Sequence, residues 1–304
     1  AGSAMGMLRR IGVSLIAVDE AHCVSQWGHD FRPDYLRIGE LRRALDVPLA
    51  AFTATADAET QVEIVEKLFD GQPPQSFLRG FDRPNIHLAF APKDSPRKQI
   101  MDFAAARKGQ SGIIYCGTRA RTESLATALR QSGHNACHYH GGMEPQDRRD
   151  VETRFNTDDG LIVVATVAFG MGVDKPDIRW VAHADLPKSI EAYYQEIGRA
   201  GRDGAPAETL TLYGADDIRL RRAQIDEGMA PPERRAADHG RLNALLGLAE
   251  ALGCRRQQLL RYFGEEAEPC GNCDLCDSPP EVFDGTEAVR KALSAALRTG
   301  ENFG

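Results

Sequence analysis

The chain has 304 residues, of which 42% are hydrophobic, and a formal net charge of −7. This length leaves room for two or more domains, and no apolar run approaches the roughly 20 residues that a membrane-spanning helix needs. The acidic balance does not favour nucleic-acid binding, although a local basic channel is compatible with it. Residues 1–6 lack the layout of a signal peptide and resemble a cloning remnant, so we expect a soluble intracellular protein.

The first predicted strand ends in two acids. Residues 13–18 form a short, β-branched apolar run that is typical of a buried strand, and Asp19 and Glu20 follow it. Acids at the carboxyl end of such a strand lie where open α/β sheets bind ligands. Nucleotide hydrolysis uses such a pair: one carboxylate holds Mg²⁺ through water, and the other orients or deprotonates the attacking water. On these residues alone, the alternative to a nucleotide site is an ordinary strand end whose carboxylates are solvated.

The loop after the acids carries aromatic and basic side chains, namely Trp27, His29, Phe31 and Arg32. Aromatic faces stack on unpaired bases, which contributes about 1–3 kcal/mol per base in single-strand sites, and an arginine binds phosphate. The loop therefore predicts a single-stranded nucleic acid beside the hydrolytic acids. Packing of Trp27 and Phe31 into a core is the alternative.

Apolar runs alternate with amphipathic stretches up to about residue 215. We predict strands at residues 15–18, 49–53 and 76–78, helices at 36–44 and 60–68, and a linker around 81–85. Further strands are predicted at 112–115, 136–139, 161–165, 180–184 and 209–213, with helices at 122–131, 145–155 and from about 190. This alternation predicts an α/β fold with mostly parallel sheets and helices on both faces.

Polar and small residues follow the later strands, namely Thr118, Arg119, Gly141 and Gly142. A hydroxyl and a cation at a strand end suit a DNA phosphate, and paired glycines let a phosphodiester approach the backbone closely. His138 and His140 share one face of a strand, so a metal site is the alternative there.

Residues 193–204 read Tyr-Tyr-Gln-Glu-Ile-Gly-Arg-Ala-Gly-Arg-Asp-Gly. On a continuous helix, Gln195, Arg199 and Arg202 share one face. A glutamine and two arginines suit a γ-phosphate, where an arginine finger contributes about 10³–10⁵ in rate. A solvated arginine face is the alternative.

Four cysteines predict a metal centre: Cys270, Cys273 and Cys276 recur at two-residue intervals, with Cys254 upstream. Four thiolates at such spacing predict tetrahedral structural zinc. An iron–sulfur cluster uses the same ligands, and free buried thiols are a third possibility. We expect the ion to join two segments that otherwise share little core.

Together and in this order, the motifs resemble those of RecQ-family DNA helicases, superfamily 2 enzymes whose DEAH box is matched by Asp19-Glu20-Ala21-His22. The resemblance implies RecA-like parallel sheets and a small helical zinc-binding subdomain. It places the C-terminal half of a first lobe at 7–80, a second lobe at 85–215, the zinc-binding subdomain at 216–278 and the start of a winged-helix domain at 279–304.

The resemblance also implies a function: ATP-dependent, 3′-to-5′ unwinding of DNA with a single-stranded tail, in repair and recombination, in the bacterial cytoplasm at the nucleoid. Asp19 would bind Mg²⁺, Glu20 would act as the base, and Arg199 and Arg202 would stabilise the phosphate charge. The remaining implied residues are Gln195 in catalysis, His22, Gly170, Gly172 and Asp174 around the nucleotide, and Thr166 on the DNA backbone.

A phosphate loop of the form G-x-x-x-x-G-K-[S/T] does not occur in the sequence. We therefore expect an incomplete first lobe with uncovered apolar surface, and poor ATP hydrolysis by this chain alone. The alternative function is a non-catalytic DNA-binding or protein-docking fragment. The sequence does not predict protein partners.

Overall fold

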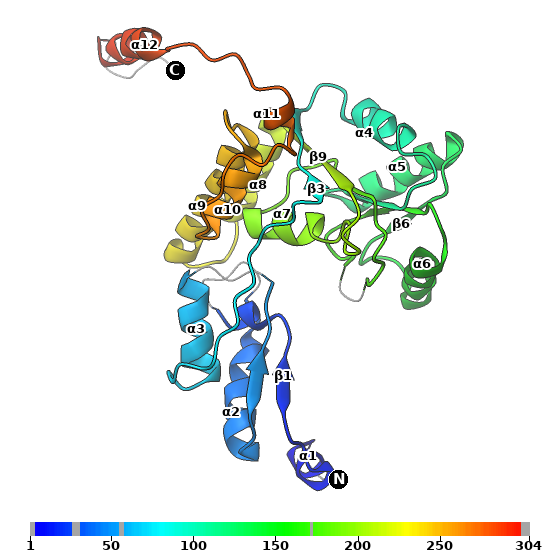
Figure 1. Ribbon diagram of the computed structural model, residues 1–304, viewed down its shortest axis with the longest axis vertical. Coiled ribbons are helices and arrows are strands. Elements are labelled where there is room, and N and C mark those ends of the chain that lie inside the picture. Colours follow the sequence, from blue (N-terminus) through cyan, green and yellow to red (C-terminus); the bar gives the residue numbers. More distant parts are fainter. Residues whose placement is uncertain (1–3, 26–30, 55–57, 171–172, 299–304) are drawn as a thin grey trace.

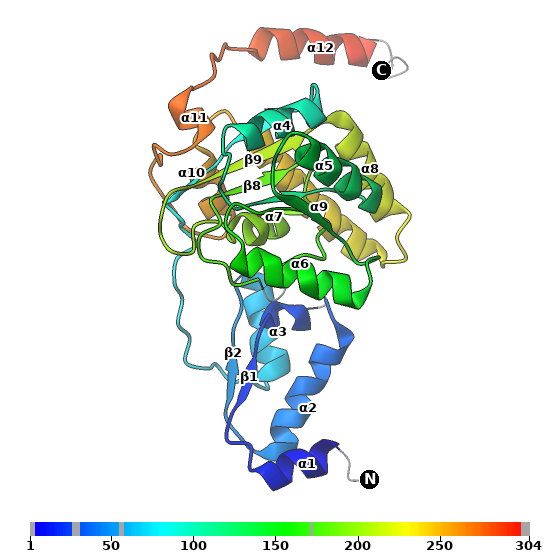
Figure 2. The same cartoon turned by 90° about the vertical axis from the view of Figure 1, so that its right-hand side faces the viewer.

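The structure is a computed structural model that describes residues 4–25, 31–54, 58–170 and 173–298. Three of the predicted site residues, Trp27, His29 and Gly172, lie outside these ranges. The chain forms a small two-stranded unit, then a large sheet with its helices, and then a helical module (Figure 1). The first helix and the last lie at opposite ends of the long axis (Figure 2).

The two-stranded unit has a small core of its own. Its elements are α1 (Ala4–Ile11), β1 (Ile16–Val18), the 3-10 turns Ala21–Val24 and Pro33–Tyr35, α2 (Leu36–Leu45), β2 (Leu49–Ala51) and α3 (Ala58–Leu68). The strands pair in parallel, with Ile16 opposite Leu49. Val18, Ile64 and Leu68 form its buried centre. As expected, apolar side chains stay uncovered on this unit, with Phe52 57% exposed.

The strand predicted at residues 76–78 is not formed, and that prediction is wrong. Phe77 and Leu78 are 82% and 80% exposed, in a segment without regular structure. An apolar run becomes a strand only where a neighbour supplies backbone partners and an apolar face to pack on. The described residues supply neither to this segment.

The large sheet is parallel at every described pairing. Its strands are β3 (Ile86–His87), β4 (Phe90–Pro92), β5 (Gly112–Tyr115), β6 (Ala136–Tyr139), β7 (Ile162–Ala165), β8 (Trp180–His183) and β9 (Ala207–Tyr213). They lie in the order β3-β9-β8-β5-β7-β6, and β4 also pairs with β9. Strands β5, β7 and β8 are buried throughout, which explains their continuous apolar runs.

Helices cover both faces of this sheet (Figure 2). They are α4 (Pro96–Ala105), α5 (Arg119–Gln131), α6 (Pro145–Thr157) and α7 (Ile190–Ile197). Successive strand residues point to opposite faces, so Ile113 packs with Phe155 of α6, whereas Ile114 packs with Leu129 of α5. The predicted parallel α/β architecture is therefore confirmed.

Helix α7 ends earlier than the sequence pattern suggested. It stops at Ile197, and Gly198 follows as its C-cap. Gly201 has a φ of +56°, a left-handed conformation that favours glycine and ends helices. The prediction that Gln195, Arg199 and Arg202 share one face of a continuous helix is therefore wrong. Arg199 and Arg202 lie in residues 198–205, which we call the arginine turn.

The helical module consists of α8 (Ala215–Asp226), α9 (Pro232–Ala249), α10 (Arg255–Tyr262) and α11 (Asp274–Asp277). It shares one buried cluster with the large sheet, which joins Tyr193 of α7 and Leu88 to Leu245, Cys254 and Cys273. The expectation that the cysteine segments share little core is therefore wrong. The cysteine spacing predicted only the contact through the ion, whereas apolar side chains of α7, α9 and α10 pack together.

Helix α12 (Thr286–Arg298) follows an extended segment and has no buried residue. Figure 1 shows it away from the helical module. None of the helices in the described ranges combines the length and the apolar character needed to cross a membrane.

Candidate nucleotide cleft, nucleic-acid edge and metal centre

The predicted acids directly follow β1. The backbone N–H of Glu20 donates to Oδ1 of Asp19 at 2.8 Å, and Glu20 has a φ of +51°, an uncommon conformation for a residue with a side chain. His22 is buried behind the acids, with Nδ1 2.9 Å from Oγ1 of Thr53 and 3.4 Å from Oε2 of Glu20. His22 therefore joins the acids to the end of β2.

The carboxylates remain accessible. Asp19 is exposed, and the side chain of Glu20 is 42% exposed. Exposed oxygen ligands at the carboxyl end of a strand suit a magnesium ion that keeps most of its waters. The residues present therefore fit a hydrated Mg²⁺ together with the phosphates of a nucleotide.

The arginine turn packs against the segment after β7. Nη1 of Arg199 donates to the carbonyl oxygen of Gly170 at 2.7 Å. Nη1 of Arg202 donates to the carbonyl oxygen of Val173 at 3.0 Å and to Oδ1 of Asp174 at 3.2 Å. Four of the predicted nucleotide residues therefore form one cluster, although they come from two distant segments.

A buried donor in this cluster has no hydrogen-bond partner among the described residues: Nε of Arg199. Such a group costs free energy unless a ligand, a water or a rearrangement satisfies it. Gln195 lies two residues before the end of α7 and is half-buried. The cluster thus offers a guanidinium donor to an incoming anion.

The predicted DNA-binding residues after β5 and β6 lie at one edge of the sheet. Both strands flank β7, with Tyr115 and Tyr139 each opposite Ala165. Parallel strands that end in register bring the following loops to the same edge. We call this edge, formed by Thr118, Arg119, Gly141, Gly142 and Thr166, the polar edge.

Two members of the polar edge meet directly. A Cβ added to Gly142 would lie 2.7 Å from Nη1 of Arg119, so a side chain there would displace the guanidinium. Oγ1 of Thr118 accepts from the N–H of Arg121 at 3.3 Å and caps α5. Arg119 and both glycines are exposed, whereas Thr166 is half-buried.

The alternative of a metal site at His138 and His140 does not fit the hydrogen bonds of these residues. Nδ1 of His140 accepts the backbone N–H of Gly142 at 3.2 Å, so the ring proton is on Nε2, which lies 2.8 Å from Oε1 of Glu123. Glu123, His138 and His140 are close enough for a shared ion, but both nitrogens of His140 are already used. A hydrogen-bond network explains this cluster.

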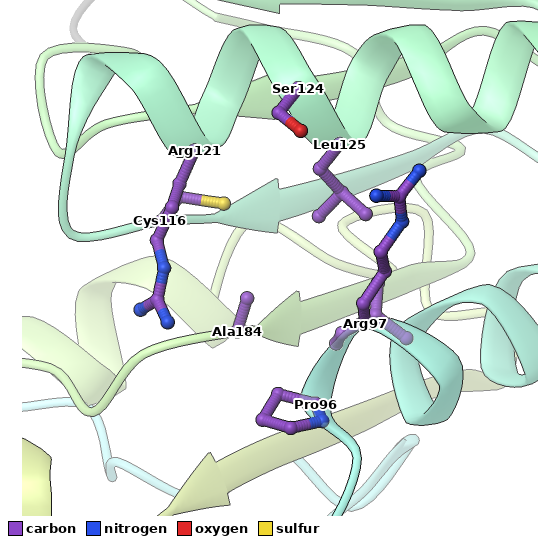
Figure 3. Close-up of a pocket in the computed structure, with 8 residues that line it drawn as sticks. Pro96, Arg97, Cys116, Arg121, Ser124, Leu125 and Ala184 are labelled. Atoms are coloured by element: carbon purple, nitrogen blue, oxygen red, sulfur yellow. The ribbon is translucent and has the colours of Figure 1, made fainter.

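A pocket of about 190 Å³ opens beside the polar edge, with Cys116 and Ala184 on the sheet side. Figure 3 shows Arg97 of α4 and Arg121 of α5 on either side of it. Arg121 also pairs with Asp185, whose Oδ1 lies 2.8 Å from Nζ of Lys93. The guanidinium groups add positive charge to this edge of an acidic protein.

The described part of the aromatic loop contacts the helical module. The guanidinium carbon of Arg234 in α9 lies 6.0 Å from the centroid of the Phe31 ring, within the range of a cation–π contact. Phe31 and Arg32 are both half-buried. The loop therefore reaches a second structural unit.

The four predicted cysteines converge. Their sulfur atoms all lie within 4.8 Å of one another, which fits the tetrahedral thiolate shell of zinc. Burial raises the pKa of the Cys254 thiol, but hydrogen bonds from the backbone N–H groups of Gln257 and Cys270 outweigh it and bring the pKa to about 7. Burial raises the pKa of the Cys270 and Cys276 thiols, so the converging sulfur atoms, rather than the thiol pKa values, indicate a bound cation. The chain carries a structural zinc site.

The sequence did not indicate Arg83 and Asn85, whose side chains bind the carbonyl groups of the arginine turn. It also missed the buried group of Lys93, Asp185 and Asp217. No short motif contains these residues, because each pairs with a segment about 90 or more positions away in the chain.

Two family models match the chain. Residues 96–204 match the helicase conserved C-terminal domain, and residues 215–277 match the RecQ zinc-binding domain. The chain is 46% identical over 294 residues to the ATP-dependent DNA helicase RecQ of Haemophilus influenzae, which covers 96% of this chain and 47% of that protein.

The RecQ of Bacillus subtilis is 37% identical over 301 residues, which covers 98% of this chain and 51% of that protein. The chain thus spans about half the length of these curated relatives. Among solved structures, Saccharomyces cerevisiae Dbp5 bound to RNA and ADP BeF3 is similar with a TM-score of 0.57 and 18% identity, over 80% of this chain and 68% of Dbp5. This likeness confirms the RecA-like fold.

Proposed function

The chain belongs to the RecQ family of helicases, and from this premise we propose that it forms part of an ATP-driven DNA helicase. The helicase moves 3′ to 5′ on single-stranded DNA and unwinds tailed duplexes in repair and recombination, in the bacterial cytoplasm at the nucleoid. The observation that carries the proposal is the cluster of Arg199 and Arg202 with Gly170 and Asp174.

The acids act on the nucleotide. Magnesium, when bound, neutralises phosphate charge as the bond to the leaving group breaks. Asp19 holds the hydrated ion, and Glu20 orients the attacking water and accepts its proton. His22, tied to Thr53 and close to Glu20, keeps the second carboxylate in place.

The arginine turn acts on the same nucleotide from the other side of the cleft. Arg199 and Arg202 exchange their carbonyl and carboxylate partners for the oxygen atoms of the γ-phosphate, and Gln195 lies near the end of α7, just before the turn. A guanidinium bond to an ionised phosphate is stronger than one to a neutral carbonyl, which favours the exchange at Gly170 and Val173. The side chain of Asp174 is 94% exposed, so water screens its pairing with Arg202. We assign Gly170, Gly172 and Asp174 to nucleotide binding beside these guanidinium groups, and Gly172 lies outside the described residues.

The polar edge and the aromatic loop bind the DNA strand. Arg119 and Thr118 hold phosphates, the paired glycines let the backbone approach, and Thr166 joins this edge to the arginine cluster through the segment after β7. Trp27, His29, Phe31 and Arg32 stack on bases or bind phosphate next to the acids. Binding of DNA to these residues can thereby change the position of the acids and arginines that act on the nucleotide.

In this proposal, residues 7–80 form the C-terminal half of a first lobe, 85–215 a second lobe, 216–278 the zinc-binding subdomain and 279–304 the start of a winged-helix domain. The sequence contains no phosphate loop. That observation favours a second candidate function for this chain by itself, a DNA-binding fragment without turnover.

ATP hydrolysis tests the proposal in two proteins. One is this chain alone. The other, which we call the fusion protein, joins this chain to the part of the Haemophilus influenzae RecQ that precedes the matched region. We expect background ATP hydrolysis and salt-dependent binding of 3′-tailed DNA by the chain, and DNA-stimulated hydrolysis by the fusion protein.

Robust turnover by the chain alone would contradict the need for a phosphate loop. A fusion protein that is folded and binds an ATP analogue, yet shows no DNA-stimulated hydrolysis, would contradict the proposed helicase function.

A further inference from the structure

Arg83, in the segment that joins the two sheets, binds the arginine turn. Its Nη1 donates to the carbonyl oxygen of Gly198 at 3.0 Å. Its Nη2 donates to those of Ala200 at 2.9 Å and Gly201 at 3.0 Å. These carbonyl groups lie at and after the C-cap of α7, where a cation is favoured by the helix dipole and satisfies acceptors that lack a helical partner.

Asn85, two residues after Arg83 in the linker, also binds the arginine turn. Its Nδ2 donates to the carbonyl oxygens of Gly201 at 2.8 Å and Ala205 at 2.9 Å. A Cβ on Gly201 would overlap Nδ2 of Asn85. Two linker side chains therefore define the path of the backbone that carries Arg199 and Arg202.

On the opposite side, a buried arginine of the helical module holds the linker. Arg256 of α10 is 5% exposed. Its Nη1 donates to the carbonyl oxygen of Arg83 at 2.9 Å and to Oδ1 of Asp82 at 3.2 Å, and its Nη2 donates to the carbonyl oxygen of Ile86. One guanidinium thus fixes the linker backbone from which Arg83 extends.

Aromatic contacts strengthen this attachment. The ring of Phe81 stacks on Phe263 with centroids 4.5 Å apart and meets Tyr194 of α7 edge-on at 5.7 Å. The backbone N–H of Phe81 donates to Oε1 of Glu265 at 2.9 Å. Phe81 is therefore held between the helical module and α7.

We propose that Arg83 and Arg256 are positioning residues, through which the zinc-bearing helical module sets the placement of Arg199 and Arg202. The inference rests on the proposed function of these two arginines. Arg256 holds the linker, Arg83 holds the turn, and the turn carries the guanidinium groups that contact the segment after β7. A movement of the linker is thereby transmitted to the residues that stabilise the phosphate charge.

The bonding pattern of Arg83 favours a role in positioning the arginine turn over a contact that only stabilises the fold. Arg83 forms no ion pair within the described ranges, and all the hydrogen bonds of its side chain given above go to the arginine turn. A planar guanidinium with several donors can hold three carbonyl groups at once, whereas the ammonium of a lysine is a compact point charge. The site therefore requires the geometry of arginine as well as its charge.

Hydrogen exchange on the unmodified chain gives the first test, because it does not depend on ATP hydrolysis. We expect Arg83→Ala to raise amide exchange in residues 198–205 on the order of tenfold, with zinc content unchanged. Arg83→Lys should give a smaller increase, and the exposed Arg79, which precedes the linker, provides the control variant Arg79→Ala. Unchanged exchange in residues 198–205 on Arg83→Ala would overturn the inference.

Kinetics of the fusion protein give the second test. We expect Arg83→Ala and Arg256→Ala to lower kcat on the order of tenfold or more with little change in KM for ATP, since misplacement affects the transition state. Millimolar guanidinium should partly restore kcat in Arg83→Ala and should not restore it in Arg199→Ala.

The outcomes separate the two claims. If Arg199→Ala leaves kcat unchanged, the proposed function fails. If Arg199→Ala lowers kcat but both positioning variants match Arg79→Ala in kcat, only the positioning inference fails.

Discussion

Nη1 of Arg199 donates to the carbonyl oxygen of Gly170 at 2.7 Å, and a Cβ on Gly170 would overlap Nη2 of the same arginine. Gly170 also has a φ of +151°, which residues with side chains rarely adopt. Both the lack of space for a Cβ and the positive φ therefore require glycine at position 170. The bond between Arg199 and Gly170 links the segment after β7 to the arginine turn.

Replacing Gly170 by alanine should displace the guanidinium and strain the backbone. We expect Gly170→Ala to cost about 1–3 kcal/mol of stability and to lower DNA-stimulated kcat of the fusion protein on the order of a hundredfold. Thermal unfolding and steady-state ATP hydrolysis measure the two effects. Gly133→Ala, at a glycine with φ +81° and open space around it, controls for strain alone; equal kcat in both variants would contradict the prediction.

Removing zinc should loosen both the helical module and α7. Structural zinc contributes on the order of 10 kcal/mol in small zinc peptides, and Cys273 lies in the same buried cluster as Tyr193 of α7. We expect one zinc per chain, and faster proteolysis of Cys273→Ser both within residues 216–278 and within α7. Cys137→Ser, outside the metal centre, is the control. New cleavage confined to 216–278 would show that the shared cluster does not couple the two.

Acid should weaken the fold through Asp185. Burial raises the pKa of its carboxyl, but the Lys93 ammonium and the N–H of Gly117 outweigh this and hold the pKa below its ordinary value. A lowered folded-state pKa contributes stability that is fully present above the unfolded value of about 3.9 and is lost as the pH falls below it.

We therefore expect Asp185→Asn to cost about 3 kcal/mol at neutral pH, and the difference from the parent chain to shrink below about pH 4. Urea unfolding of both proteins from pH 3 to 7 measures this difference in the free energy of unfolding. Asp159→Asn removes an exposed carboxylate and should show little effect. A difference for Asp185→Asn that is constant over this range would sink the prediction.

Arg119 should contribute to DNA binding through a phosphate. Its exposed guanidinium lies over Gly142 at the polar edge. We expect Arg119→Ala to weaken single-stranded DNA binding by this chain similarly for all sequences, and to reduce the slope of log K against log salt by about 1. Arg222→Ala, on exposed surface of α8, should leave the slope unchanged. An equal effect of the two variants would argue against the polar edge.

The sheet and the metal centre were predictable because their signals are local. The buried run Gly112–Tyr115 and its neighbours read as strands from apolar character alone, and they pair in parallel as expected. The spacing of Cys270, Cys273 and Cys276 indicated the converging sulfur atoms. Both inferences need only residues that lie close together in the chain.

The rest depends on tertiary contacts. The arginine spacing suggested a continuous helix, but Gly198 and Gly201 end it, and Arg83 then holds the turn from 115 positions away in the chain. Residues 76–78 have the composition of a strand without a partner. The cysteine spacing indicated the metal centre, but nothing local indicated that the helices around it pack on α7.

The most direct test of the account is the rate of DNA-stimulated ATP hydrolysis by the fusion protein with Arg199→Ala or Glu20→Gln. Arg199 should stabilise the phosphate charge, and Glu20 should accept the proton of the attacking water. We predict that each substitution lowers kcat by about 10³-fold or more, while binding of single-stranded DNA stays within about twofold of the parent. A kcat within about threefold of the parent for Arg199→Ala would contradict the account.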